Sequence, residues 1–203
     1  QFDKTYNRRV VTNAAEVKRI SKLYMSDMYE IYSDISDFLP KTVENILDIG
    51  CGMGGIDLFL YKHYQQKVKI HLLDSHCVDD TINIGFHSNA VDFSFYNDFQ
   101  LSTDYLSGNG VSIDDINTIN IKTQDFPSEH KFELIVSLLS WGFHFPLATY
   151  LGEVFDCLAD DGVLILDIRD GTEGLIELSD VFGCEPLVIR KMTGYSTVMV
   201  SKK

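Results

Sequence analysis

A glycine-rich turn set between a short apolar strand and a helix constrains the fold of this chain more than any other feature. Residues 45–49 read as the strand, residues 50–55 (GCGMGG) form the turn, and residues 54–64 have helical spacing. Glycines let the backbone turn tightly and approach a ligand, and the free N–H groups at the start of the helix point towards it. The next predicted strand, 68–73, leads into Asp74, an acid suited to accept hydrogen bonds from ribose hydroxyls. The pattern therefore predicts a nucleoside-containing cofactor at the carboxyl ends of parallel strands.

Short apolar runs and helical patterns continue to alternate along the chain, which indicates β-α units and a mostly parallel sheet. Further strands are predicted at 116–121, 132–139 and 163–168, and further helices at 147–159 and 172–182. Gly162 is predicted to end the first of these helices. Residues 186–191 and 195–201 are β-rich and closely spaced, so we expect them to pair as an antiparallel hairpin. The predicted fold class is therefore α/β.

Two segments lie outside this alternation. Residues 1–40 carry apolar positions at helical spacing up to a proline, which predicts one long or two short amphipathic helices. This N-terminal helical extension either packs on the core or covers a ligand as a lid. We expect residues 41–203 to form one domain. Within it, residues 75–110 are too long for a loop without structure, and their aromatic side chains form either an inserted binding segment or a local core.

The charge balance excludes several classes of partner. The chain has 17 Lys and Arg against 30 Asp and Glu, a net charge of −13, which works against binding to nucleic acids and to anionic membrane surfaces. No apolar run approaches the roughly 18 residues of a membrane span, and no signal peptide opens the chain. The four cysteines lie far apart, without a C-x-x-C or familiar zinc-ligand spacing, and indicate free thiols in a reducing compartment. We therefore expect a cytoplasmic protein with no metal and no membrane partner.

Two classes of cofactor fit the glycine turn. Gly50, Gly52 and Gly55 match G-x-G-x-x-G, which is typical of NAD-binding proteins. Asp48 discriminates between the classes, because a carboxylate close to the turn is poorly placed beside a pyrophosphate but well placed to hold a cationic amino-acid group. S-adenosylmethionine carries an ammonium and a sulfonium and no phosphate, so Asp48 favours it. An NAD-dependent oxidoreductase is the alternative, although no Tyr-x-x-x-Lys pair lies near the predicted cofactor site.

Residues 40–201 resemble the class I S-adenosylmethionine-dependent methyltransferases, and the D-x-G-x-G-x-G motif at residues 48–54 carries the resemblance. That family has a Rossmann-like, seven-stranded, mostly parallel sheet of order 3-2-1-4-5-7-6, with helices on both faces and an antiparallel last strand, as the C-terminal hairpin would provide. By resemblance the turn holds the methionine portion of the cofactor, Asp74 the ribose, and the segment after the third strand the adenine. The implied cofactor-binding residues are Asp48, Gly50, Cys51, Gly52, Gly54, Asp74, Ser75, Gln124, Asp125, Phe126 and Leu138.

The acceptor is predicted from the segment that follows the fourth strand. It has no Asn-Pro-Pro-Tyr or Asp-Pro-Pro-Tyr motif and no cysteine nucleophile after a proline, features of nucleic-acid methyltransferases. Together with the negative charge, this favours a small-molecule acceptor, and we expect O-methylation of a metabolite or sugar-like hydroxyl. His144 is the predicted base, because its titration range suits proton abstraction near neutral pH. Trp141 and His144 are predicted to contact the acceptor, and residues 75–110 are a candidate acceptor-side insertion. A non-catalytic, cofactor-binding subunit of the same fold is the other alternative.

Overall fold

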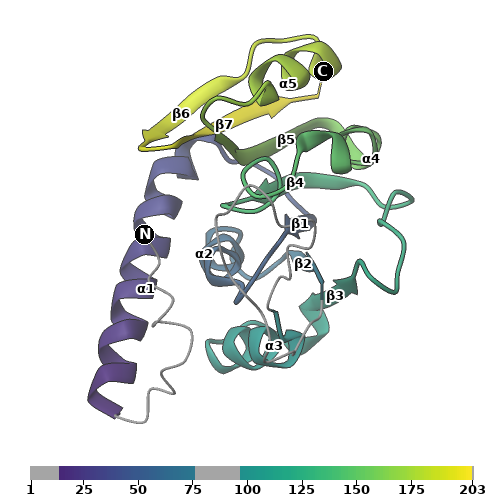
Figure 1. The fold of residues 1–203 in the computed structure, drawn as a ribbon. Helices are drawn as coiled ribbons and strands as arrows, with labels where there is room; N and C mark the ends of the chain where they lie inside the picture. The colour runs from purple at the N-terminus through teal and green to yellow at the C-terminus, as the bar shows by residue number, and fades with distance from the viewer. Residues whose placement is uncertain (1–13, 76–96, 203) are drawn as a thin grey trace.

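The sheet forms the centre of the molecule and runs from β3 at one edge to β6 at the other. The computed structural model describes residues 14–75 and 97–202. Its strands lie in the order β3-β2-β1-β4-β5-β7-β6 (Figure 1). They are β1 Asn45–Ile49, β2 Lys69–Asp74, β3 Ile116–Asn120, β4 Phe132–Ser137, β5 Leu158–Arg169, β6 Leu187–Met192 and β7 Tyr195–Ser201. The first five pair in parallel, and β7 is antiparallel to both of its neighbours. The predicted fold class, strand order and C-terminal hairpin are confirmed.

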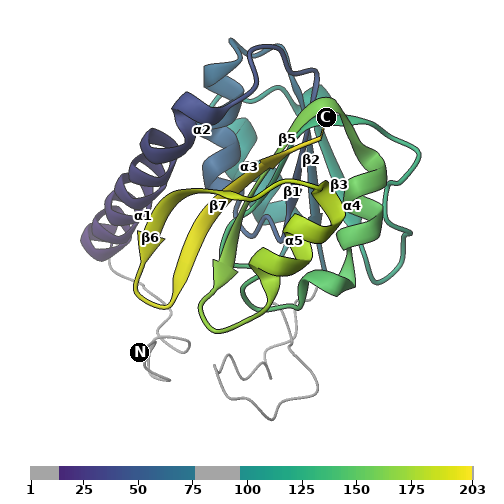
Figure 2. The same ribbon diagram turned by 90° about the horizontal axis from the view of Figure 1, so that it is seen from above.

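Helices cover both faces of the sheet, because neighbouring residues of a strand point to opposite sides. α1 Ala14–Ile35, α2 Gly55–His63 and α3 Phe99–Gly108 lie on one face, and α4 Leu151–Cys157 and α5 Gly174–Phe182 on the other (Figure 2). Short 3-10 helices are η2 Ser36–Phe38, η3 Ile113–Asp115 and η4 Leu147–Thr149. Ile46 of β1 is buried in the same cluster as Leu60 of α2, whereas Leu47 is buried in the same cluster as Val154 of α4. Apolar burial on both faces thus holds the two helical layers to the sheet.

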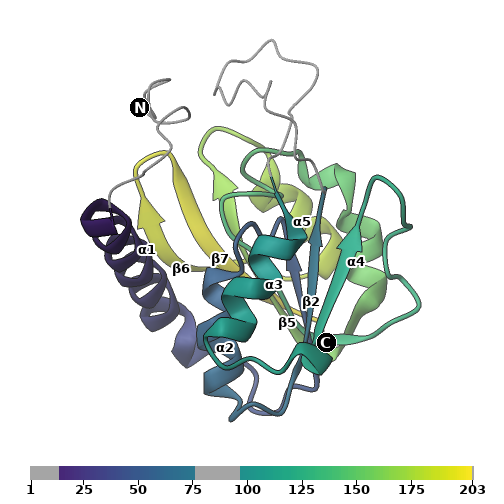
Figure 3. The same cartoon turned by 90° about the horizontal axis from the view of Figure 1, so that it is seen from below.

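α1 is one long helix that packs along the body of the protein, beside α2 and β6 (Figure 3). The ring of Tyr32 stacks on Phe59 of α2, with centroids 5.5 Å apart. Tyr24 lies so close to the glycine turn that a Cβ at Gly55 would overlap the Tyr24 hydroxyl. α1 is therefore an integral part of the helical layer. The predicted lid function stays a prediction, and residues 1–13 lie outside the described residues.

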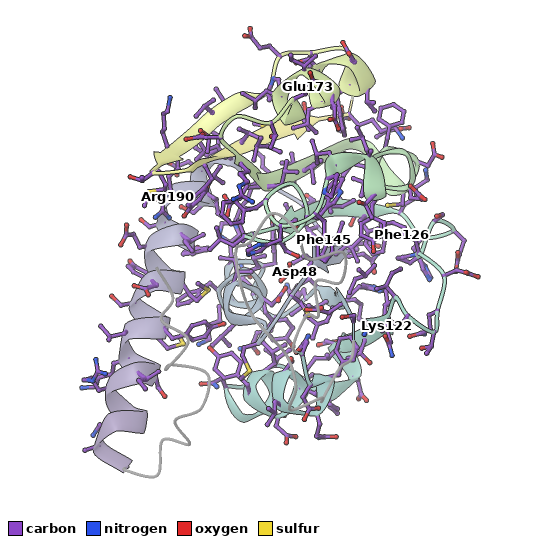
Figure 4. All side chains as sticks on the ribbon, viewed as in Figure 1. Asp48, Lys122, Phe126, Phe145, Glu173 and Arg190 are labelled. Atoms are coloured by element: carbon purple, nitrogen blue, oxygen red, sulfur yellow. The ribbon has the colours of Figure 1, made fainter. Side chains whose placement is uncertain are left out.

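The edge strand β6 is irregular and is partly covered by α1. Its pairing with β7 shifts register between Val188 and Arg190. The Arg190 guanidinium faces α1, with Nε 3.4 Å from Asp34 Oδ2 and Nη2 3.7 Å from Glu30 Oε1 (Figure 4). The side chain of Arg190 is only 13% exposed, so the ion pair lies within the contact between α1 and β6.

The helix predicted over 147–159 is shorter than expected, and its predicted glycine stop is wrong. α4 ends at Cys157, and β5 begins at Leu158, which pairs with Phe132 of β4. A register shift follows, where Asp161 has a left-handed backbone conformation (φ 60°). A Cβ at Gly162 would lie 2.7 Å from the carbonyl oxygen of Ala159. Gly162 is therefore required by an irregularity inside the strand and does not end the helix.

The described part of the segment 75–110 contains α3. Asp98 caps the first turn of this helix, because its side chain accepts from the N–H of Gln100 at 3.0 Å. Residues 76–96 of this segment lie outside the described residues. Nowhere in the described part of the chain is a helix both long and apolar enough to span a bilayer.

Candidate active site

The glycine turn joins β1 to α2 in a backbone conformation that is unfavourable for residues other than glycine. Gly50, Gly52 and Gly54 have φ angles of 76°, 51° and 73°. A Cβ at Gly50 would also overlap the side chain of Ser140, whereas Gly52 faces open space. The N–H of Gly50 donates to the carbonyl of Leu73 at 2.7 Å, which fixes the turn against the end of β2. The turn therefore offers bare backbone to a ligand at this edge of the sheet.

A cavity of about 50 Å³ lies at the carboxyl ends of β1, β2 and β4, where open α/β sheets bind their ligands. Its lining includes Gly50, Asp74, Ser75, Trp141, Phe145 and Tyr150. Trp141 is fully buried, and its Nε1 donates to the carbonyl of Leu147 at 3.0 Å. The cavity thus brings together four of the predicted site residues, Gly50, Asp74, Ser75 and Trp141. We name this the cofactor cavity.

Asp74 is held in place by three N–H donors and, at the longer distance of 4.0 Å, by the thiol of Cys51, which donates to Oδ2. Its Oδ2 accepts from the N–H of Gly52 at 3.1 Å and from Asn97 Nδ2 at 3.0 Å, and its Oδ1 accepts from the N–H of Ser75 at 2.7 Å. Burial raises the pKa of Asp74, and the three N–H donors act against that rise. Among the described residues only the N–H of Ser75 donates to Oδ1, so this oxygen can still accept a hydroxyl from the cavity that Asp74 lines. Asn97 was missed in the sequence, since it lies in a segment with no clear pattern.

Residues just after Asn97 support the same turn from α3. Ser102 Oγ donates to the carbonyl of Gly52 at 2.6 Å, and a Cβ at Gly54 would lie 3.1 Å from Leu106 Cδ1. Cys51, inside the turn, is buried and accepts from Asn97 Nδ2 at 3.4 Å. Burial raises the pKa of the Cys51 thiol, so it stays neutral. The described part of the predicted insertion therefore stabilises the turn, and its acceptor-side role stays a prediction.

Asp48 lies beneath the turn and is absent from the lining of the cofactor cavity. Alternation along β1 directs Asp48 to the same face as Ile46, under α2, where Asp57 is also buried. Apart from Asp48, no other described residue donates a hydrogen bond to the carboxylate oxygens of Asp57. Two such acids avoid paired negative charges by sharing a proton. Asp57 had a signal in the sequence, because it precedes Leu60 and Tyr61 by one helical turn and so falls on the buried stripe of α2.

Burial raises the pKa of both acids, that of Asp57 to about 6 and that of Asp48 well above its usual range, and their mutual repulsion adds to the rise at Asp48. The pair therefore places a single negative charge under the turn near neutral pH. The predicted contact of Asp48 with a cationic amino-acid group stays a prediction.

The segment predicted to contact adenine follows β3. Gln124 and Asp125 are exposed, and Gln124 Oε1 accepts from the N–H of Asn120 at 2.7 Å. Phe126 is half-buried, with its ring centroid 5.3 Å from that of Tyr150, which lines the cofactor cavity. Leu138 packs partly buried against the core on the α2 side. Phe126 thus packs against a residue that lines the cofactor cavity. The cofactor contacts of Gln124, Asp125, Phe126 and Leu138 stay predictions.

A second hollow, of about 230 Å³, adjoins the cofactor cavity at Phe145, which lines both. Its walls are the loop 142–147, Arg169 at the end of β5, and the segment that begins α5. His144 lines this hollow, and burial and then the positive charge of Arg169 lower the pKa of His144. The predicted base is therefore a neutral imidazole near neutral pH, next to the cofactor cavity. Trp141 lines the cofactor cavity, and its acceptor contact stays a prediction.

The loop after β4 is held by Asp167, which sequence reasoning missed. Asp167 Oδ2 accepts from the N–H of Leu139 at 2.9 Å, and Oδ1 accepts from Thr197 Oγ1 at 2.6 Å. Leu139 has a positive φ of 53°, which is uncommon for leucine. A Cβ at Gly142 would lie 2.8 Å from the carbonyl oxygen of Asp167. The course of this loop thus depends on contacts with β5 and β7, which are distant in the sequence.

The sequence matches a family model described as a methyltransferase domain over residues 24–178, more than half of the chain. Among proteins with curated descriptions, none matches this sequence.

Solved structures of similar fold include methyltransferases with different acceptors. The 16S rRNA N2 G1207 methyltransferase of T. thermophilus, in complex with AdoMet and guanosine, is 15% identical, with a TM-score of 0.55 over 89% of this chain and 42% of that one. A candidate O-methyltransferase from Nostoc punctiforme PCC 73102 is 14% identical, with a TM-score of 0.60 over 91% and 58%. The ribosomal protein L11 methylase of Lactobacillus delbrueckii subsp. bulgaricus is 16% identical, with a TM-score of 0.52 over 88% and 79%.

The chain spans about half the length of the first two of these structures, and identities this low show a likeness of fold alone. The family match decides between the two predicted cofactor classes, because it sets aside the NAD-dependent alternative. The glycine turn, the strand order and this match agree: the chain belongs to the methyltransferase domain family, whose methyl donor is S-adenosylmethionine.

Proposed function

We propose that this chain transfers the methyl group of S-adenosylmethionine to a hydroxyl oxygen of a small molecule. The observation that carries the proposal is that Phe145 lines both the cofactor cavity and the hollow whose wall includes His144. An acceptor in that hollow lies next to a cofactor bound over the glycine turn. The bound cofactor supplies a methyl group on a positively charged sulfur, and alignment of the two reactants accounts for much of the catalysis in such reactions.

The residues around the cofactor cavity fit this donor. Gly52 faces open space, so a ligand can lie directly on its backbone. Asp74 Oδ1, which accepts from Ser75, retains capacity for a ribose hydroxyl. The single negative charge of Asp48 and Asp57 beneath the turn attracts a cationic amino-acid group, whereas it would repel a pyrophosphate. These features support Asp48, Gly50, Gly52 and Asp74 as cofactor-binding residues.

His144 suits the role of general base. It lines the hollow as a half-buried side chain, and its lowered pKa keeps the imidazole neutral and able to accept a proton near neutral pH. A hydroxyl acceptor that donates to this imidazole loses its proton as its oxygen attacks the methyl group. The positive charge of Arg169 disfavours the protonated imidazole, so His144 readily gives the proton up again.

A small acceptor fits the hollow better than a polymer. At about 230 Å³ it is smaller than the roughly 300 to 1,000 Å³ of sites for drug-sized ligands. The net charge of −13 also works against a nucleic-acid acceptor, since phosphate contacts need Lys and Arg. The first structural relative methylates an rRNA base, so the fold alone does not select the acceptor.

The organisation of the chain completes the proposal. Residues 1–40 serve as a helical extension and residues 41–203 as the catalytic domain, and α1 contributes to the site by packing Tyr24 on the turn at Gly55. Cys51, Cys157 and Cys184 are free thiols, which supports a reducing, cytoplasmic location.

Methyl transfer from labelled S-adenosylmethionine to a panel of small aromatic and sugar-like alcohols tests the function. With an active acceptor, His144→Gln should lower kcat by about 10² to 10⁴ and leave the affinity for S-adenosylhomocysteine unchanged. Asp74→Ala should weaken S-adenosylhomocysteine binding itself.

His130→Gln is the matched control, because His130 is an exposed histidine that precedes β4, outside the linings of both sites. Its kcat should equal that of the wild type. Wild-type turnover by His144→Gln would remove His144 as base, and tight cofactor binding by Asp74→Ala would show that the cofactor lies elsewhere.

A further inference from the structure

Among the described residues that line the hollow beside the cofactor cavity are two apolar rings and a cationic side chain. Phe143 and Phe145 provide the rings, and Arg169 provides the guanidinium. His144 is neutral near neutral pH, so it does not add to this positive charge. A hollow of this composition suits a ring-sized ligand that carries one anionic group.

The position of Arg169 is set by several independent contacts. Its N–H donates to the carbonyl of Gly142 at 3.2 Å, and its carbonyl accepts from Thr172 Oγ1 at 2.8 Å. The guanidinium carbon lies 5.6 Å from the centre of the Phe143 ring, and that ring packs edge-on against Tyr195, with centroids 5.5 Å apart. The cation is therefore held at the hollow by the end of β5 and by the β7 side of the hairpin.

A guanidinium that lies over an aromatic ring keeps its N–H donors in its own plane. In that plane a carboxylate or a phosphate accepts two of them at once, which is the strongest geometry for recognising either group. The remainder of the protein is acidic, so general electrostatic attraction does not concentrate anions here. Recognition of an anion at this place would depend on Arg169 itself.

We propose that Arg169 binds an anionic group of the methyl acceptor, so that the acceptor is a small, ring-sized molecule with a carboxylate or phosphate in addition to its hydroxyl. This inference rests on the proposed function, because it takes the hollow as the acceptor site. Glu177 of α5 also lines the hollow, and its negative charge disfavours a second anionic group on the acceptor.

The test measures binding to the full-length protein saturated with S-adenosylhomocysteine, by NMR titration and without turnover. The ligands are 4-hydroxybenzoate, phenyl phosphate and, as the neutral analogue, methyl 4-hydroxybenzoate. At least one anion should bind about tenfold more tightly than the neutral ester, and Arg169→Gln should remove that difference while leaving ester binding unchanged. Arg169→Lys should retain part of it, because lysine keeps the charge without the planar fork.

Lys122→Gln is the control, since Lys122 is exposed after β3 and lines neither site, and it should behave as the wild type. Equal affinity for the anions and the ester overturns the inference, as does an anion preference that survives in a folded Arg169→Gln protein. The comparison of carboxylate with phosphate identifies the group that Arg169 prefers. Anion binding through Arg169 without any methyl transfer would sustain this site and count against the proposed function, so the two failures are distinguishable.

Discussion

The carboxyl groups of Asp48 and Asp57 lie together, shielded from solvent, between β1 and the first turn of α2. Asp48 is 3% exposed and Asp57 is 0% exposed. Among the described residues, the other titratable groups coupled to the charges of this pair are Asp74 of β2, Tyr24 of α1 and Cys51 of the turn, and none of them supplies a positive charge. A buried acid pair without a cation lowers the stability of the folded protein. Proteins keep such a pair mainly where its charge has a function.

This pair makes stability depend on pH in a defined direction. The pKa of Asp57 is raised from 3.8 to about 6 in the folded protein, so its contribution to stability is fully present below about pH 3.8 and is lost as the pH rises through about 6. Asp57→Asn, which keeps a donor for Asp48, should therefore be more stable than the wild type by about 1 to 3 kcal/mol near pH 8. The gain should shrink towards about pH 4.5.

Urea unfolding at both pH values checks this prediction, with Asp180→Asn on the exposed face of α5 as the control. A gain that is equal at the two pH values would mean that the pair does not share a proton.

The second prediction separates two glycines of the turn. Gly50→Ala should cost at least about 2 kcal/mol, because its Cβ meets Ser140 as well as a positive φ, whereas Gly52→Ala should cost only the roughly 1 kcal/mol of backbone strain. In a Ser140→Gly background the cost of Gly50→Ala should fall to that of Gly52→Ala, because the overlapping side chain is gone. Chemical denaturation of the four variants and the wild type measures this coupling, and no reduction in the Ser140→Gly background would exclude the steric explanation.

The third prediction concerns the electrostatic coupling of His144 to Arg169. Burial lowers the pKa of His144 first, and the nearby cation lowers it further. Arg169→Gln removes the cation, so the pKa of His144 should rise towards its ordinary value of about 6.5, and the acidic limb of the rate profile should move to higher pH with it. NMR titration of the imidazole protons measures the shift directly. An unchanged pKa would show that burial alone lowers it.

The fourth prediction addresses Asn97. Asn97→Ala removes one of the three N–H donors to Asp74 and leaves the carboxylate less firmly oriented, so the affinity for S-adenosylhomocysteine should fall by about threefold to tenfold. Asn117→Ala, at an exposed position in β3, should bind as the wild type does. Calorimetric titration with S-adenosylhomocysteine provides the measurement. Wild-type affinity in Asn97→Ala would mean that the N–H groups of Gly52 and Ser75 are enough to orient the Asp74 carboxylate.

Local patterns in the sequence were enough to predict most of the sheet. β1 was predicted with its observed bounds, 45–49, because an apolar run ends abruptly at glycine, and the hairpin followed from two β-rich runs around one short turn. Gly162 shows the limit of such reasoning. A glycine after a helical pattern normally ends the helix, but here Leu158 joins the sheet first and the glycine serves the strand.

The site was predictable only where its residues carry a sequence motif. Gly50 and Asp74 meet in the cofactor cavity as the D-x-G-x-G-x-G pattern and the following strand imply. The contact of Asp57 with Asp48 arises when α2 packs on β1, and the contact of Asp167 with Leu139 requires β4 and β5 to be neighbours. Helical spacing placed Asp57 on the buried face of α2, but spacing does not show which residue of another element it meets, so both contacts emerged only from the structure.

The irregular edge strand β6 has a consequence for the behaviour of the protein in concentrated solution. Edge strands can recruit further chains into a growing sheet, and Leu187 and Val188 of β6 are both about half exposed, at 48%. The register shift before Arg190 and the ion pair of Arg190 with α1 interrupt that edge. A shortened chain that lacks α1 would lose this protection and would tend to precipitate through edge-to-edge pairing of its strands.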